Sequence, residues 1–131
     1  MQSKGLTLIE LLISAGILAF AICGLIFQVN NGILLNKINR DFTVALSHAQ
    51  YVLEGMKNTP RLQLQTDIIN GVWNWNTILD FNSNGLTRIR HTAGDENIVT
   101  NFVAGNPLGV IVRVSWNDPR PRQIQLRTLF N

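Results

Sequence analysis

The sequence predicts an α+β fold, in which a long N-terminal α-helix packs on a small antiparallel β-sheet head and the first half of that helix spans a membrane. Three features support this prediction: an apolar N-terminal run, a following stripe of apolar residues at helical spacing, and two C-terminal segments of alternating polarity. The 131 residues leave room for one domain and an anchor. With 46% hydrophobic and only 15% charged residues, the chain is too apolar to be disordered.

The apolar run comprises residues 6–27, which include a single charge, Glu10. As a helix it would reach roughly 33 Å, and a bilayer core is roughly 30 Å thick. A carboxylate in such a run costs about 2.5–3.5 kcal/mol on insertion scales, so Glu10 needs a partner or a function. The single cysteine, Cys23, excludes an internal disulfide, and we expect it to face lipid or a neighbouring helix.

Residues 28–58 are predicted to form the amphipathic second half of the same helix. No proline interrupts residues 6–58, and Thr59-Pro60 marks the expected end. The heptad-like spacing fits a coiled coil or, as we favour, a helix laid against its own head. The stripe consists of Leu35, Ile38, Phe42, Ala45, Ala49, Val52 and Met56.

Residues 59–131 form the expected head, which reads as loop-rich after Pro60 and then as β-structure. Residues 110–116 and 123–130 alternate between apolar and polar side chains, and residues 117–121 between them contain two prolines. This pattern predicts a terminal hairpin with one apolar face, joined by a turn at 117–121, on which the helix stripe would pack. A further strand is expected around Leu86–His91, whereas Trp73–Phe81 is ambiguous.

The N-terminus admits three interpretations. The chain begins Met1-Gln2-Ser3-Lys4-Gly5, and the apolar run then begins Leu6-Thr7-Leu8-Ile9-Glu10. A secretory signal peptide would have a shorter apolar core of about 7–15 residues. A plain signal anchor would keep Lys4 on the cytoplasmic side. Neither interpretation explains Glu10.

The third interpretation is a resemblance. The segment resembles the class III signal of type IV prepilins, a short basic leader that ends in Gly and is followed by an apolar residue and Thr-Leu-Ile-Glu. The resemblance implies that a prepilin peptidase removes residues 1–5 by cleavage between Gly5 and Leu6 and N-methylates Leu6, where the family usually has Phe. It also implies that Glu10 pairs with the terminal amine of a neighbouring subunit, which sets the register of the helices in a filament.

The terminal hairpin, with Val-Ser-Trp before the turn and Leu-Arg-Thr-Leu after it, is similar to minor pilins of the PilV type and to minor pseudopilin I of type II secretion. The resemblances imply a minor pilin that primes assembly of a type IV pilus. Alternatives are a minor pseudopilin of a type II secretion system, a competence pilus subunit that contacts DNA, and a membrane-anchored binding module.

The implied partners are other pilins of the filament, the prepilin peptidase, an inner-membrane platform protein and, before assembly, membrane lipid. The implied location is the bacterial inner membrane, crossed once with the head in the periplasm, and then the pilus or pseudopilus.

Other motifs are weaker. Residues 80–85 fit the first half of a calcium loop, with Asp80, Asn82 and Asn84 as weak candidate ligands, but the twelfth position is His91 instead of Glu. We therefore favour an Asn-Gly turn between two strands. His48 and His91 have no further ligand at metal-binding spacing, so no metal site is predicted.

In the terminal hairpin, Arg113 and Arg127 share the polar face, with Arg120 and Arg122 at the turn. This arginine cluster fits a solvated face that limits edge pairing, or an anion or DNA contact.

Trp73 and Trp75 fit core or subunit contacts better than a stacking platform for a ligand. The sequence has no nucleophile elbow and no glycine-rich phosphate loop, so we expect no enzymatic activity, catalytic residue or cofactor.

Overall fold

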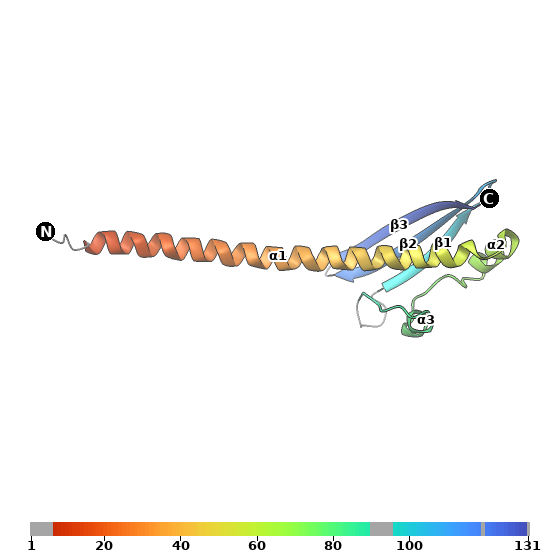
Figure 1. Ribbon diagram of the computed structural model, residues 1–131, viewed down its shortest axis with the longest axis horizontal. Coiled ribbons are helices and arrows are strands. Elements are labelled where there is room, and N and C mark those ends of the chain that lie inside the picture. The colour runs from red at the N-terminus through yellow and green to blue at the C-terminus, as the bar shows by residue number, and fades with distance from the viewer. Residues whose placement is uncertain (1–6, 90–95, 119, 131) are drawn as a thin grey trace. The chain divides into compact units, whose positions relative to one another are not determined.

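The computed structural model describes residues 7–89, 96–118 and 120–130 (Figure 1). The chain divides into two compact units, an N-terminal unit, Met1–Asn39, and a head unit, Arg40–Asn131. The described elements confirm the predicted α+β fold, a long N-terminal helix and a three-stranded antiparallel sheet. In chain order they are α1 (Leu8–Lys57), α2 (Arg61–Ile69), α3 (Ile78–Ser83), β1 (Glu96–Val103), β2 (Leu108–Asp118) and β3 (Arg120–Phe130).

The described part of the N-terminal unit is the first portion of α1. The helix begins at Leu8, directly after Thr7, and side chains from Thr7 to Asn31 are exposed in the isolated chain. By length and composition α1 can cross a membrane, and no residue of its most apolar window is buried. Because this segment is apolar on all sides, it is suited to lipid or to neighbouring helices rather than to water.

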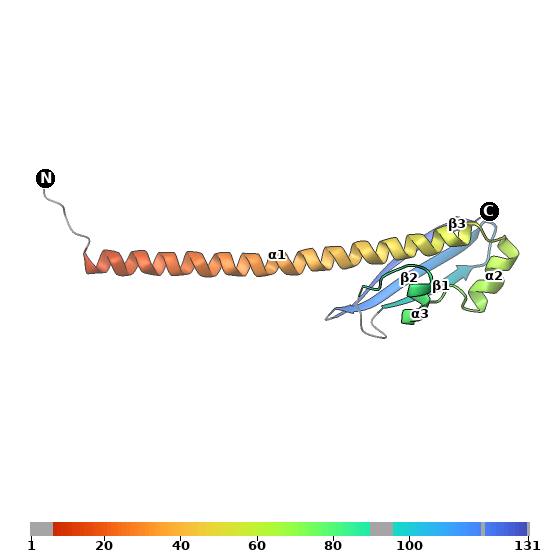
Figure 2. The ribbon, with the colours of Figure 1, turned by 60° about the horizontal axis from the view of Figure 1, so that its bottom comes forward.

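In the head unit, the last part of α1 packs on one face of the sheet (Figure 2). Ala45, Ala49, Val52 and Met56 of the predicted stripe are fully buried, which confirms that this part of the helix lies against its own head. Phe42 is partly exposed, and Leu35 lies in the N-terminal unit and is exposed. The buried core therefore uses only the C-terminal members of the stripe.

The sheet has the strand order β1-β2-β3, with both pairs antiparallel. The predicted terminal hairpin is confirmed, with Val112 opposite Leu126 and Val114 opposite Ile124 on the face that contacts the core. Pairing continues to Asp118 and Arg120, so the predicted turn at residues 117–121 was too long. Strand β2 lies in the centre, and its core-facing residues from Leu108 to Trp116 are buried.

Three expectations for the middle of the chain were wrong. Helix α2 begins directly after Pro60, where a loop was expected, because Leu64 and Ile68 reach the core from one face of a helix. Asn84 and Gly85 do form the expected turn, with Gly85 at a φ of 68°, but the turn follows helix α3 and does not join two strands. Residues 86–89 form no strand, and the rest of that predicted strand, to His91, lies outside the described residues.

Strand β1 was not predicted, because its buried face mixes polar and apolar residues. Glu96, Ile98 and Thr100 are all buried on that face, so the strand lacks simple alternation of polarity. The segment Trp73–Phe81, whose secondary structure the sequence left ambiguous, forms a β-bridge between Trp75 and Ile98 and then enters helix α3 at Ile78.

Candidate functional site

The candidate assembly site of the N-terminal unit is built around Glu10. Its Oε2 accepts hydrogen bonds of 2.9 Å from both the backbone N–H and the hydroxyl of Thr7. The Glu10 N–H donates to Thr7 Oγ1 at 3.3 Å. This reciprocal pattern is a capping box that satisfies donors at the start of α1. The Thr-x-x-Glu spacing could have revealed it in the sequence.

Glu10 is thus a carboxylate placed at the first turn of a helix whose surface is otherwise uncharged up to Lys37. The helix N-terminus favours a negative charge there through its unpaired N–H groups. The side chain is exposed in the isolated chain, so a cation from another molecule can reach it. Gly5 and Leu6, the predicted cleavage and methylation positions, lie outside the described residues.

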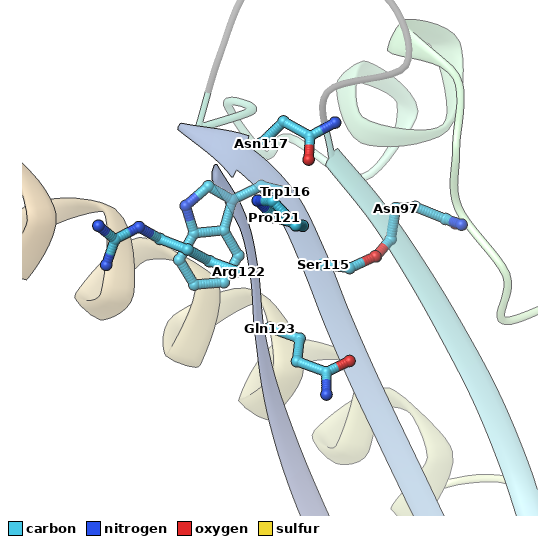
Figure 3. A pocket seen from close by; sticks show the side chains of 7 residues that line it. All are labelled: Asn97, Ser115, Trp116, Asn117, Pro121, Arg122 and Gln123. Atoms are coloured by element: carbon cyan, nitrogen blue, oxygen red, sulfur yellow. The ribbon is translucent and has the colours of Figure 1, made fainter. Parts of the chain in front are cut away.

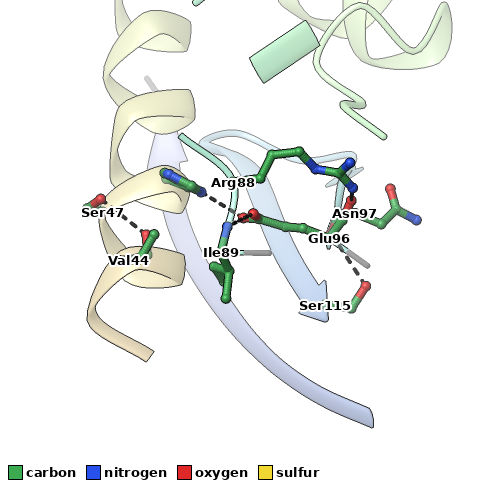
Figure 4. A network of polar contacts seen from close by, with 8 residues as sticks. Val44, Ser47, Arg88, Ile89, Glu96, Asn97 and Ser115 are labelled. Carbon is green, nitrogen blue, oxygen red and sulfur yellow. Dashed lines mark hydrogen bonds and ion pairs between the residues drawn. The ribbon is translucent and has the colours of Figure 1, made fainter. Parts of the chain in front are cut away.

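The head unit contains a buried polar cluster that the sequence did not predict (Figure 4). His48 Nδ1 of α1 lies 2.7 Å from Glu96 Oε1 of β1, and both side chains are almost fully buried. Glu96 Oε2 accepts the backbone N–H of Ile89 at 2.8 Å. One carboxylate therefore joins the helix, the first strand and the segment before that strand.

Arg88 completes this cluster. Its Nη2 donates to the backbone carbonyl oxygen of Glu96 at 2.9 Å, and its guanidinium lies 5.3 Å from the ring centre of Phe81. Arg88 Nε and Nη1 are buried and have no hydrogen-bond partner among residues 7–89, 96–118 and 120–130. The cluster joins α1 to β1, an edge strand of the sheet. One signal was available, since His48 lies three residues after Ala45 and four before Val52, on the buried face.

The weak calcium candidates do not converge. Asp80 Oδ2 accepts the backbone N–H groups of Asn76 at 3.1 Å and Thr77 at 2.9 Å, which makes Asp80 part of a capping box for α3. The Thr77 backbone and hydroxyl bonds lower the pKa of Asp80 below its ordinary value of 3.8. Asn84 donates to the Asp80 carbonyl, and Asn82 is exposed.

Across the part of the chain that the structure describes, no group of three or more His, Cys, Asp or Glu residues could hold a metal ion. His48 is engaged with Glu96, and His91 lies outside the described residues.

The arginine cluster divides between the two faces of the sheet. Arg113 and Arg127 are exposed on the face opposite α1, as alternation predicted. Arg122 lies on the other face, with its guanidinium 6.0 Å from the ring centre of Phe42. The cluster is therefore not a single patch.

A shallow depression of about 550 Å³ lies where β2 and β3 approach their hairpin (Figure 3). Asn97, Ser115 and Gln123 line it from three neighbouring strands, and Asn117 and Pro121 close one end. Four of its seven lining residues are neutral and polar and can form hydrogen bonds, and Trp116, Pro121 and Arg122 complete the lining with apolar surface and one positive charge.

The tryptophans of the middle segment belong to the core. Trp75 is 5% exposed, and its ring lies 6.2 Å from that of Phe81. Trp73 packs against the core with its ring close to Gly55, where an added Cβ would approach Cζ3 to 3.0 Å. These contacts agree with the favoured core role.

Comparisons of the chain with protein-family models, with curated proteins and with solved structures found no match.

Proposed function

We propose that this chain is a minor pilin, a structural subunit that primes assembly of a type IV pilus. The observation that carries the proposal is the position of Glu10, the only charged residue between Lys4 and Lys37, in the first turn of a membrane-length helix. A lone carboxylate in that setting is costly unless a cation meets it. A filament of parallel helices would supply one such cation for each subunit.

The chemistry follows from cleavage between Gly5 and Leu6. Removal of the leader creates an amine at Leu6, about one helical turn from Glu10. Thr7 already orients the carboxylate by two bonds to Oε2. In a low-dielectric bundle, pairing of Glu10 with the amine of the next subunit would set the axial position of each helix.

The head unit supports a structural role. Its core encloses the end of α1, and the buried polar cluster joins that helix to β1. Such a head would be carried as a folded body outside the inner membrane while the apolar helix remains in lipid or enters the filament. The prepilin peptidase, the platform protein and the other pilins would be its partners.

A minor pseudopilin of a type II secretion system and a competence pilus subunit would use the same N-terminal site. A membrane-anchored binding module would have no need for Glu10 or for cleavage at Gly5. Processing therefore separates the filament subunits from the anchored module.

The test is the intact mass of the chain extracted from membranes of strains with and without the prepilin peptidase. We expect loss of Met1–Gly5 and gain of one methyl group only when the peptidase is present. An uncut chain in both strains, or a chain cut near Phe27, would reject the proposal.

A second arm uses Glu10→Gln, with Ser14→Ala as the control. Ser14 lies one turn further on and only bonds to the Glu10 carbonyl oxygen. We expect Glu10→Gln to be cleaved and to remain in the membrane but to be lost from sheared filaments, whereas Ser14→Ala enters them normally. Equal recovery of both variants in filaments would contradict the role given to Glu10.

A further inference from the structure

The sheet has a second, outward face, opposite the one that packs on α1. It consists of alternate residues from Asn97 to Val103 in β1, from Gly109 to Asn117 in β2 and from Pro121 to Leu129 in β3. Most of its β3 side chains are exposed, as are Arg113 and Asn117 of β2. We call this surface the outer face.

The outer face is rich in primary amides and contains no carboxylate at any of these positions. Each amide offers two donors and one acceptor, a combination that suits hydroxyl groups. Among the described residues, these amide groups form no hydrogen bond with one another or with neighbouring side chains. The amides are those of Asn97, Asn101, Asn117, Gln123 and Gln125.

Two arginines add positive charge to the middle of this face. Arg113 lies opposite Gln125 and Arg127 opposite Ile111, so the two arginines are diagonal neighbours, with backbones roughly 7–8 Å apart. An added Cβ on Gly109 would lie 3.7 Å from Arg127 Nη2, so the absence of a side chain at Gly109 gives this guanidinium room to lie across β2. Neither arginine forms an ion pair within the described residues.

We propose that the outer face binds an acidic polysaccharide, with its carboxylates on Arg113 and Arg127 and its hydroxyl groups on Gln125, which lies opposite Arg113, and on the other amides of the face. A guanidinium can bind a carboxylate through two parallel hydrogen bonds. The depression beside Asn97, Ser115 and Gln123, which Trp116 and Pro121 also line, continues the surface toward the hairpin, so a chain of several sugars has polar and apolar contacts along its length.

Nucleic acid fits the same surface less well. The outer face presents no aromatic side chain at its described positions, and Trp116, which lines the depression, is only 2% exposed, so little aromatic surface is open to stacking of bases. Duplex DNA binders commonly neutralise about 6–10 phosphates, whereas this face carries two arginines. A neutral polysaccharide would leave both guanidinium groups without a carboxylate. This inference does not depend on the proposed pilin function.

The test measures binding of the full chain in detergent micelles to immobilised polygalacturonate, dextran and duplex DNA at physiological salt. We expect binding to polygalacturonate at least 10-fold tighter than to dextran or DNA. No retention on polygalacturonate, or equal affinity for either of the other polymers, would overturn the proposal.

The variant Arg113→Gln/Arg127→Gln should weaken polygalacturonate binding at least 10-fold. Lys57→Gln/Arg120→Gln removes the same charge from positions off the outer face and should bind within 2-fold of the wild-type chain. Both variants must keep the wild-type thermal midpoint. Because both arginines are exposed, their replacement should not disturb folding. Equal affinity of the two variants would reject the role of the outer face.

Discussion

Glu96 shows at the scale of one residue how this head is held together. Its two carboxylate oxygens meet His48 and the backbone of Ile89, and its own carbonyl oxygen accepts a bond from Arg88. A buried carboxylate is tolerable only with such partners, since its removal from water is costly. One side chain thus links α1 to the strand that the sequence did not predict.

Replacement of Glu96 by Leu should strongly destabilise the head. The change leaves the buried His48 ring and the partly buried Ile89 N–H without their acceptor, and breaking a buried pair typically costs about 3–5 kcal/mol. Urea unfolding followed by tryptophan fluorescence would measure the loss. The control is Glu54→Leu, which changes an exposed carboxylate on α1, the helix that carries His48.

The double variant His48→Leu/Glu96→Leu extends this test. We expect its loss of stability to be smaller than the sum of the two single losses, because both members of the pair are removed together. Strict additivity would show that the two side chains do not act as a pair.

At the scale of the element, α1 can approach the sheet closely because small residues lie on its buried face. Ala45 and Ala49 are fully buried. Larger side chains at these positions would push the helix away from its neighbours. The spacing of these alanines in the sequence therefore carries information about packing distance as well as about the buried face.

Ala49→Leu should destabilise the head by about 1–3 kcal/mol, because a close-packed core must shift to admit the extra atoms. Gln50→Leu is the matched control, since the next residue along α1 is exposed. Urea unfolding of both variants would measure the difference. If Ala49→Leu were as stable as Gln50→Leu, the close approach at Ala49 would be disproved.

The capping box at the start of the short helix α3 predicts that the stability of this helix depends on pH. Because the Thr77 bonds lower the pKa of Asp80 below 3.8, the ionised carboxylate stabilises the folded state above pH 3.8. This stabilisation is lost as the pH falls through the lowered pKa. Solvent screening keeps the effect below about 1 kcal/mol.

Asp80→Asn should therefore speed amide hydrogen exchange in α3 at neutral pH. The difference between the variant and the wild-type chain should vanish once the pH falls well below 3.8, where the wild-type carboxyl is protonated as well. Asp67→Asn removes a carboxylate from α2 with no such cap and should leave exchange in α3 unchanged. A difference that persists at low pH would contradict the assignment.

At the scale of the whole molecule, the described buried residues all belong to the head unit. The first of them is Asp41, and the apolar core begins at Ala45. The helical segment before Asn39 contributes no buried side chain. The N-terminal unit therefore has a helix apolar enough to cross a membrane, whereas the buried core lies in the head unit.

A fragment from Arg40 to Asn131 should accordingly fold by itself. Every buried residue of the described core is retained in it, including the last turns of α1. We expect a soluble monomer with one cooperative thermal transition. A second fragment that begins at Pro60 would lack Ala49, Val52 and Met56 and should not unfold cooperatively. Cooperative unfolding of the shorter fragment would show that α1 is not part of the core.

Local pattern in the sequence was sufficient for the elements whose two faces differ in polarity. The long apolar run and the buried positions from Ala45 to Met56 follow from helical spacing. The hairpin of β2 and β3 follows from strict alternation, because a shift by one residue would turn every apolar side chain to the solvent. The capping box of Thr7 and Glu10 was also visible in the sequence, but only its carboxylate was interpreted.

Tertiary contacts decided the rest. Strand β1 buries Glu96 and Thr100 because His48, Asn74 and Ile89 satisfy them from other parts of the chain. No local pattern specifies such partners, since a buried polar residue looks like a surface residue until its neighbours are known. The sequence by itself determined the membrane-length helix and the terminal hairpin, because each of them has a pattern of polarity that can be recognised within its own residues. Only the folded structure determined how the helix is joined to the sheet and which face of the sheet stays open.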